Sequence, residues 1–73
     1  MKAKTVSQVL SKIKNDKLSL LKGDGYWYFV YYDAENNIFE TESVYTMYLS
    51  SMDVEEWVSI GKGFAEKVEN GND

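Results

Sequence analysis

The chain has 73 residues with 12 acidic and 8 basic side chains, which gives a net charge of −4, and it contains no cysteine, histidine or proline. Every basic residue is a lysine. Disulfides, thiolate or imidazole metal sites and bidentate arginine contacts are therefore excluded. Because the commonest general bases and nucleophiles are absent, most enzyme mechanisms are disfavoured, and we expect no catalytic activity, no cofactor and no metal.

The length predicts a single domain covering residues 1–73, because a core divided between two domains would leave neither with enough buried surface. We expect an ordered core at about residues 5–69, with frayed termini. Lysines interrupt the apolar positions of the N-terminal segment, and no apolar run approaches the roughly 20 residues of a membrane span. These observations predict a cytoplasmic protein that does not bind a membrane.

The two parts of the chain carry opposite charge. Residues 1–22 contain six lysines and one aspartate, a net charge of +5, whereas residues 23–73 contain two lysines and eleven acids, a net charge of −9. An asymmetry of this kind bears on partners and association rather than on fold.

A first helix is expected at about residues 5–15. Apolar residues recur there at spacings of three and four, which is one stripe of an amphipathic helix. They are Val6, Val9, Leu10 and Ile13. Thr5 is a suitable N-cap with Gln8 three residues later, and the poor helix formers that follow Lys14 suit the exit.

A hairpin is expected next. The segment LSLLK at residues 18–22 is followed by the turn GDG at residues 23–25 and by the aromatic run YWYFVYY at residues 26–32. A short apolar segment, a glycine-rich turn and a run rich in aromatic residues form the pattern of two paired strands. The GDG segment lacks the spacing and the Lys-Ser/Thr pair of a phosphate loop, so we interpret it as the hairpin turn.

A third strand is expected at residues 38–49. The segment DAENN at residues 33–37 supplies the preceding turn, because aspartate and asparagine tolerate the left-handed conformation and bond their own backbone. Its oxygens miss the register of a calcium-binding loop, which favours a solvated turn. No glycine or proline interrupts residues 38–49, which favours one long strand, with a bend near Ser43 as an option.

A second helix is expected after Asp53, which forms a capping box pattern with Glu56. Its inward stripe keeps a period of 3.6 residues, and comprises Val54, Trp57, Val58, Gly61, Phe64, Ala65 and Val68. Gly61 in this stripe would let another segment approach closely, or would merely bend the helix. Residues 71–73 are expected to fray. The predicted fold is therefore α+β, a three-stranded antiparallel β-meander with both helices packed on one face, in the order α-β-β-β-α.

Alternation along the aromatic strand assigns its side chains to two faces. The more apolar rings, Trp27, Phe29 and Tyr31, are expected to face the core, and Tyr26, Tyr28, Val30 and Tyr32 to face outward. On the third strand the expected core residues are Phe39, Tyr45, Met47 and Leu49. The expected outer residues are Ile38, Glu40, Glu42, Val44, Thr46 and Tyr48. A bulge near Ser43 would exchange these two sets beyond it.

The outer face is the candidate site. Its predicted partner-binding residues are Tyr26, Tyr28, Val30, Tyr32, Ile38, Glu40, Glu42 and Tyr48. A contiguous aromatic patch suggests an interface, and tyrosine is a favoured anchor there. The alternative is that these tyrosines only pair across strands. The leading hypothesis is a non-enzymatic protein-interaction module that forms a homodimer or binds another protein.

Two further functions are weighed against this hypothesis. Aromatic residues on a sheet with nearby lysines are typical of single-stranded nucleic-acid binders. The negative charge after residue 22, the glutamates expected beside the tyrosines and the lack of arginine argue against that partner. Alternatively, acidic residues stand in for DNA phosphates in a DNA mimic, namely Glu40, Glu42, Asp53, Glu55, Glu56, Glu66 and Glu69.

At GYWYF (25–29), ESVY (42–45) and LSSMDVEEWVSIGKGF (49–64) the chain resembles small uncharacterised proteins encoded by tailed phages and prophages. The resemblance covers roughly residues 18–69. It implies a small accessory protein that is made in a bacterial cytoplasm and acts on a host or defence protein. It carries no activity and no site residue over to this chain.

Overall fold

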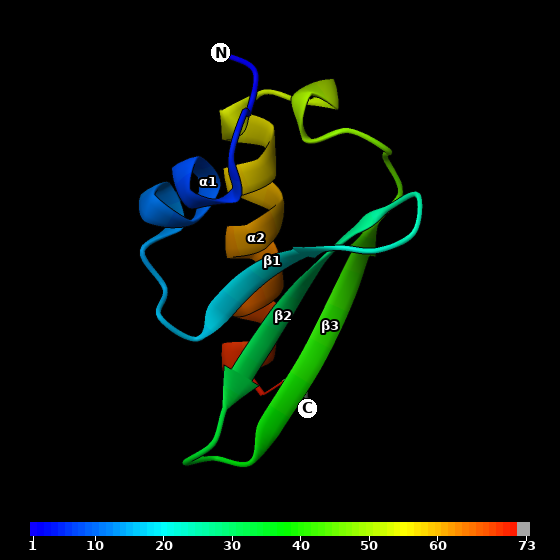
Figure 1. The fold of residues 1–73 in the computed structure, drawn as a ribbon. Coiled ribbons are helices and arrows are strands. Elements are labelled where there is room, and N and C mark those ends of the chain that lie inside the picture. The colour runs from blue at the N-terminus through cyan, green and yellow to red at the C-terminus, as the bar shows by residue number, and fades with distance from the viewer. Residues whose placement is uncertain (72–73) are drawn as a thin grey trace.

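The computed structural model describes residues 1–71 and confirms the α+β class and the order α-β-β-β-α (Figure 1). The elements are α1 (Val6–Ile13), β1 (Leu18–Lys22), β2 (Trp27–Asp33), β3 (Ile38–Val44), the short 3₁₀ helix η1 (Leu49–Ser51) and α2 (Val54–Glu69). None of the helices in the described residues has the length and apolar character needed to cross a membrane.

The three strands form one antiparallel sheet in the order β1-β2-β3. Leu18 lies opposite Tyr31 in the first pair of strands, and Ile38 lies opposite Asp33 in the second. In Figure 1 the sheet lies in front of α2, with α1 on the β1 side and β3 at the opposite border. Both helices therefore cover the same face of the sheet, as the sequence predicts.

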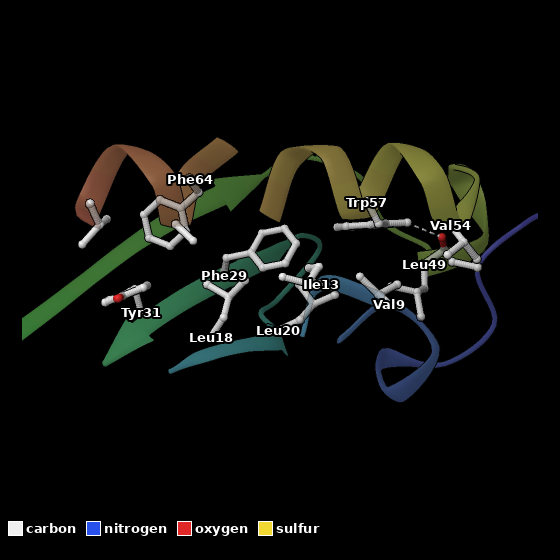
Figure 2. Close-up of a cluster of buried hydrophobic side chains, with 13 residues drawn as sticks. Val9, Ile13, Leu18, Leu20, Phe29, Tyr31, Leu49, Val54, Trp57 and Phe64 are labelled. Atoms are coloured by element: carbon white, nitrogen blue, oxygen red, sulfur yellow. Dashed lines mark hydrogen bonds between the residues drawn. The ribbon is translucent and has the colours of Figure 1, made fainter. Parts of the chain in front are cut away.

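The core lies between this face and the two helices, and Trp57 and Phe29 are its largest fully buried side chains (Figure 2). Their ring centroids are 6.2 Å apart. The Trp57 indole Nε1–H also donates a hydrogen bond of 2.8 Å to the carbonyl of Leu49, so burial leaves no unpaired polar atom on this ring. The predicted stripes of both helices face this core.

Gly61 of α2 lies where the helix passes closest to its neighbours. A Cβ atom at this position would lie 2.5 Å from Ile13 Cδ1 and 2.9 Å from Phe29 Cε1. Such distances are far below van der Waals contact, so the absence of a side chain allows α1, α2 and β2 to meet. The interpretation of Gly61 as a point of close approach is confirmed.

The helix ends follow the capping signals of the sequence. The Thr5 hydroxyl accepts a hydrogen bond of 3.1 Å from the Gln8 N–H, and the Glu56 carboxylate accepts one of 3.3 Å from the Asp53 N–H. The first helix is shorter than the expected 5–15, because Lys14 adopts the left-handed conformation with φ of 58° and donates its N–H to the Leu10 carbonyl.

The N-terminal residues pack against the start of α2. Ala3 is fully buried, and its N–H donates to the Met52 carbonyl at 3.1 Å, while the Val54 N–H donates to the Met1 carbonyl at 2.8 Å. The packed structure thus begins before residue 5, where the sequence placed the start of the ordered core. Of the tail expected to fray, residues 72 and 73 lie outside the described residues.

The third strand is shorter than the expected 38–49 and ends at Val44. Val44 lies opposite Trp27, the first residue of β2, so the next residues of the chain have no strand left to pair with. The Trp27 indole Nε1–H donates 3.2 Å to the Met47 carbonyl and holds the departing segment. Of the four residues expected on its core side only Leu49 is buried, whereas Phe39, Tyr45 and Met47 are exposed.

The expected faces of β3 are exchanged. Glu42 lies opposite Phe29 and Glu40 opposite Tyr31, so both glutamates, together with Ile38 and Val44, are on the helix-covered side of the sheet. The prediction that Ile38, Glu40, Glu42 and Val44 face outward is therefore wrong. The cause is the loop of residues 34–37, whose length pairs Asp33 with Ile38 and thereby gives Phe39 the outward position opposite Tyr32.

Candidate functional site

The side of the sheet opposite the helices carries one set of strand residues, which we call the outer face. The pairings of Tyr28 with Leu21 and Ser43, of Val30 with Ser19 and Thr41, and of Tyr32 with Phe39 define it. It comprises Ser19, Leu21, Tyr28, Val30, Tyr32, Phe39, Thr41 and Ser43. All of these except half-buried Tyr28 and buried Val30 are exposed.

Aromatic rings extend the outer face at the end where the β1–β2 hairpin turns. The ring centroid of Tyr26 lies 5.9 Å from that of Tyr28 and 6.0 Å from that of Tyr45. The Tyr26 ring rests directly on Gly23, where a Cβ atom would lie 2.5 Å from the ring. Glycine at this turn therefore leaves room for the Tyr26 ring beside the rings of Tyr28 and Tyr45.

The other end of the outer face is an exposed pair of rings. Tyr32 and Phe39 meet edge to face with centroids 6.2 Å apart, and they remain 58% and 65% exposed. A cross-strand aromatic pair stabilises a sheet, but two large rings left this exposed also offer apolar area to a partner. With Val30 between the two ends, the rings form a row along β2, which we call the aromatic row.

The structure brings together half of the predicted site. Tyr26, Tyr28, Val30 and Tyr32 lie along the aromatic row as expected, whereas Ile38, Glu40 and Glu42 lie on the helix side of β3. Tyr48 is 64% exposed but follows β3, and within residues 1–71 no ring contact joins it to the row.

The residues that sequence reasoning missed are Leu21, Phe39 and Tyr45. Leu21 follows directly from the hairpin, since the turn at residues 23–25 pairs it with Tyr28. The face on which Phe39 lies could be predicted only from the conformation of the loop at residues 34–37. A loop longer or shorter by one residue reverses the face of every residue that follows. Tyr45 lies beyond the sheet, so alternation along a strand gives no indication of its contact with Tyr26.

The exchange of faces changes the charge of the site. None of the eight residues of the outer face is acidic or basic. Glu40 and Glu42, which were expected beside the tyrosines, point to the other side of the sheet. The outer face is therefore uncharged, apolar in its rings and rich in hydroxyl groups.

On the helix side, the phenol of Tyr31 is held by the end of α2. Its O–H donates 2.9 Å to Glu69 Oε2, which also accepts 3.1 Å from the Asn15 amide. Burial of the phenol, followed by this hydrogen bond and the nearby carboxylate charges, raises the pKa of Tyr31 to about 12. The arrangement ties β2 to the end of α2 and to the loop that follows α1, and it leaves no free nucleophile or base at Tyr31.

The Asp33 carboxylate finds its hydrogen-bond donors within the DAENN turn. Its carboxylate accepts 2.7 Å from the Asn36 amide and 3.3 Å from the Asn36 N–H. The side-chain hydrogen bond from Asn36 is the main reason that the pKa of Asp33 is lowered. Within residues 1–71 no group of three acidic side chains is arranged to hold a metal ion, which fits a turn closed by its own hydrogen bonds.

A shallow, open depression follows α1 and the loop after it. Its lining includes Val6, Leu10, Lys14, Asp16 and Leu18. A lysine and an aspartate are its only ionisable side chains, and neither is buried. The depression lacks the enclosed walls and the convergent polar groups of a typical small-molecule site.

The acids considered as phosphate mimics are divided among three places. Glu40 and Glu42 lie on β3, whereas the others lie at the two ends of α2, which are about 24 Å apart for its 16 residues. Asp53 is also 3.7 Å from the Lys2 ammonium group. This division gives no single row of acids along one element.

Comparison with protein-family models, with curated proteins and with solved structures gave no match. Function is therefore inferred from the geometry of the outer face. Its rings and hydroxyls are suited to contact with another apolar surface that also supplies hydrogen-bond partners.

Proposed function

We propose that the protein is a non-enzymatic interaction module that associates with a second copy of itself through the outer face. The observation that carries this proposal is the aromatic row, which runs the length of β2 on the side of the sheet that neither helix covers. The rings of Tyr32, Phe39 and Tyr45 at its two ends are more than half exposed, and exposed aromatic area on a domain this small suggests an interaction site. Contact with another protein gives it a use.

A second copy suits this surface because identical faces must not repel each other. The whole chain carries a net charge of −4, yet the outer face has no charged side chain. With Glu40 and Glu42 among the tyrosines, two stacked faces would have brought like charges together. Their position on the helix side of β3 removes that repulsion. Two sheets then stack about 10 Å apart around a two-fold axis, with their rings interdigitated.

The size of the outer face predicts a weak dimer. Three strands spaced about 4.8 Å apart and about 7 residues long cover roughly 14 by 23 Å. This footprint of a few hundred Å² is below the roughly 800 Å² per partner of a standard stable interface. We therefore expect a transient dimer that dissociates on dilution.

The association is tested by sedimentation velocity over a concentration series, with Tyr32→Glu as the disrupting variant and Tyr48→Glu as the matched control. Both tyrosines are more than half exposed, but only Tyr32 lies on the outer face. We expect the wild type and Tyr48→Glu to shift from monomer to dimer, and Tyr32→Glu to stay monomeric. A wild type that remains monomeric throughout, or a Tyr32→Glu protein that dimerises normally, contradicts the proposal.

The phage-like sequence features favour one other protein partner for the same face, a bacterial host or defence protein. Affinity capture from a bacterial lysate with wild type, Tyr32→Glu and Tyr48→Glu separates the two occupants. A monomeric wild type that retains a protein lost only with Tyr32→Glu assigns the outer face to that partner and removes the homodimer.

A single-stranded nucleic acid is the second candidate, and the position of Glu40 and Glu42 favours it more than the sequence alone did. Bases stack on tyrosine rings, and the outer face presents no carboxylate to repel a phosphate backbone. This binding predicts quenching of tyrosine fluorescence by an oligothymidylate, with a steep loss on addition of salt. Unchanged fluorescence at low salt eliminates this candidate.

A further inference from the structure

The border of the sheet formed by β3 has unpaired backbone groups. The hydrogen bonds from Gly23 N–H to the Tyr26 carbonyl and from Tyr32 N–H to the Lys17 carbonyl show that the even-numbered residues of β2 bond to β1. Its odd-numbered residues therefore bond to the even-numbered residues of β3. The N–H and C=O groups of Phe39, Thr41 and Ser43 consequently point away from the sheet.

Nothing in the described chain covers these groups. All three residues are exposed, and outside the ladder with β2 no hydrogen bond of residues 1–71 involves their backbone. In Figure 1 α1 lies on the β1 side of the sheet, whereas β3 is its opposite border with no element beyond it. β3 is also seven residues long and free of proline and glycine. A border of this kind is a template for one more strand.

The charges on β3 define which strand fits. Glu40 and Glu42 alternate along β3 with the three residues whose N–H and C=O groups are free at the border. The side chains of both glutamates project on the helix side of the sheet. Neither belongs to an ion pair within the described part of the chain. Glu40 is exposed and Glu42 is half-buried, so a side chain from a neighbouring strand can reach both carboxylates.

A second β3 does not fit this border. Antiparallel pairing centred on Thr41 places Glu40 of one copy opposite Glu42 of the other, and like charges directly opposite each other destabilise a strand pair. The same glutamates therefore protect β3 from pairing with itself. They favour a strand that carries cations at alternate positions.

We propose that the free border of β3 binds an extended basic segment of another protein by adding it to the sheet as a fourth strand. Its backbone bonds to Phe39, Thr41 and Ser43, and lysine or arginine side chains at alternate positions pair with Glu40 and Glu42. The residue between those cations lies opposite Thr41 and the next residue on the same side lies opposite Phe39, where β-branched or aromatic side chains extend the outer face. This binding surface is separate from the stacking of outer faces.

The probe is a fluorescein-labelled heptapeptide of sequence TKVKVKT, titrated into the full chain and followed by fluorescence anisotropy. A second peptide of the same sequence carries N-methyl groups at the residues whose N–H groups bond to β3. It keeps the charge but loses those donors, so each lost hydrogen bond weakens binding roughly tenfold. A third peptide, TEVEVET, reverses the charge.

The proposal predicts that TKVKVKT binds, that its N-methylated form binds at least about tenfold more weakly, and that TEVEVET does not bind. The charge-reversed variant Glu40→Lys/Glu42→Lys is expected to exchange the preference between TKVKVKT and TEVEVET. In the wild type, the largest amide shifts on titration are expected at Phe39, Thr41 and Ser43.

Three results overturn the proposal. The first is the absence of TKVKVKT binding at low salt, which shows that the border accepts no basic strand. The second is equal binding of the N-methylated peptide, which reduces the contact to charge attraction alone. The third is amide shifts that avoid β3. The two peptide comparisons use the wild-type chain, so they stand even if the charge-reversed variant fails to fold.

Discussion

Individual residues determine how closely the helices pack against the sheet, and the two glycines of α2 illustrate this. Gly61 faces Ile13 and Phe29, whereas Gly63 has no atom within 4 Å of the position where a Cβ would stand. The same residue type thus serves packing at one position and only weakens the helix at the other. The structure distinguishes the surroundings of the two glycines, whereas the sequence GKG does not.

Alanine at these two positions is predicted to have opposite effects on stability. Each substitution gains up to about 1 kcal/mol of helix propensity. At Gly61 the added methyl group collides with Ile13 and the Phe29 ring, which costs about 1 to 3 kcal/mol. We expect urea unfolding to show a less stable Gly61→Ala and a slightly more stable Gly63→Ala. Equal stabilisation of both would contradict the close approach at Gly61.

Tyr31 gives a prediction for alkaline pH. Its pKa is about 12 in the fold against an ordinary value of 10.0, so between these values the unfolded state holds fewer protons than the folded state. The stabilisation from this phenol is therefore complete below pH 10 and is lost as the pH rises toward 12. We expect the stability advantage of wild type over Tyr31→Phe to shrink across that window in urea unfolding.

The matched variant for this prediction is Glu69→Gln, which keeps a hydrogen-bond acceptor for the phenol and removes the carboxylate charge. Because part of the raised pKa comes from that charge, the loss of stability should begin near pH 10 in both proteins but end at a lower pH and be smaller in the variant. Parallel stability curves for wild type and Tyr31→Phe between pH 10 and 12 would show that the phenol does not contribute.

At the scale of elements, the sequence predicts the helices and the first hairpin better than the third strand. The stripes of α1 and α2 and their N-caps follow from local spacing, which is sufficient because a helix is stabilised by neighbours along the chain. The faces of β3 depend instead on the loop at residues 34–37. In that loop Asn37 takes a left-handed conformation with φ of 56° and closes the pair between Asp33 and Ile38.

The last residue of β3 could not be predicted from the local sequence either. Residues 45–48 have the composition of a strand, but a strand needs a partner, and β2 begins only at Trp27. The prediction of the site residues was wrong for the same reason on β3. The tyrosines of β2 could be assigned from alternation alone, whereas Phe39 and the glutamates of β3 were assigned to the wrong faces.

Alanine substitutions in β3 test the corrected faces. Ile38 packs against the core and Phe39 is 65% exposed, the reverse of the sequence prediction. We expect Ile38→Ala to lower the free energy of unfolding by about 1 to 2 kcal/mol. Phe39→Ala should lose only its edge contact with Tyr32, about 0.5 kcal/mol. Urea unfolding at low micromolar concentration checks both values, and a larger effect of Phe39→Ala would refute the register.

At the scale of the whole molecule, the fold separates apolar surface from charge. The charged residues belong to the N-terminal segment, the helices, the loops and the helix side of the sheet, while the eight residues of the outer face carry no charge. Net charge keeps such a domain soluble, and an uncharged aromatic face allows identical copies to meet. We propose that the protein associates through this face rather than through a helix surface.

Amide chemical shifts recorded across a dilution series test this claim most directly, because they report association residue by residue. We expect concentration-dependent shifts at the outer face on all three strands, including Leu21, Tyr32 and Thr41, and none along the exposed side of α2. Shifts that are confined to the helices, or spectra that do not change with concentration, would contradict it.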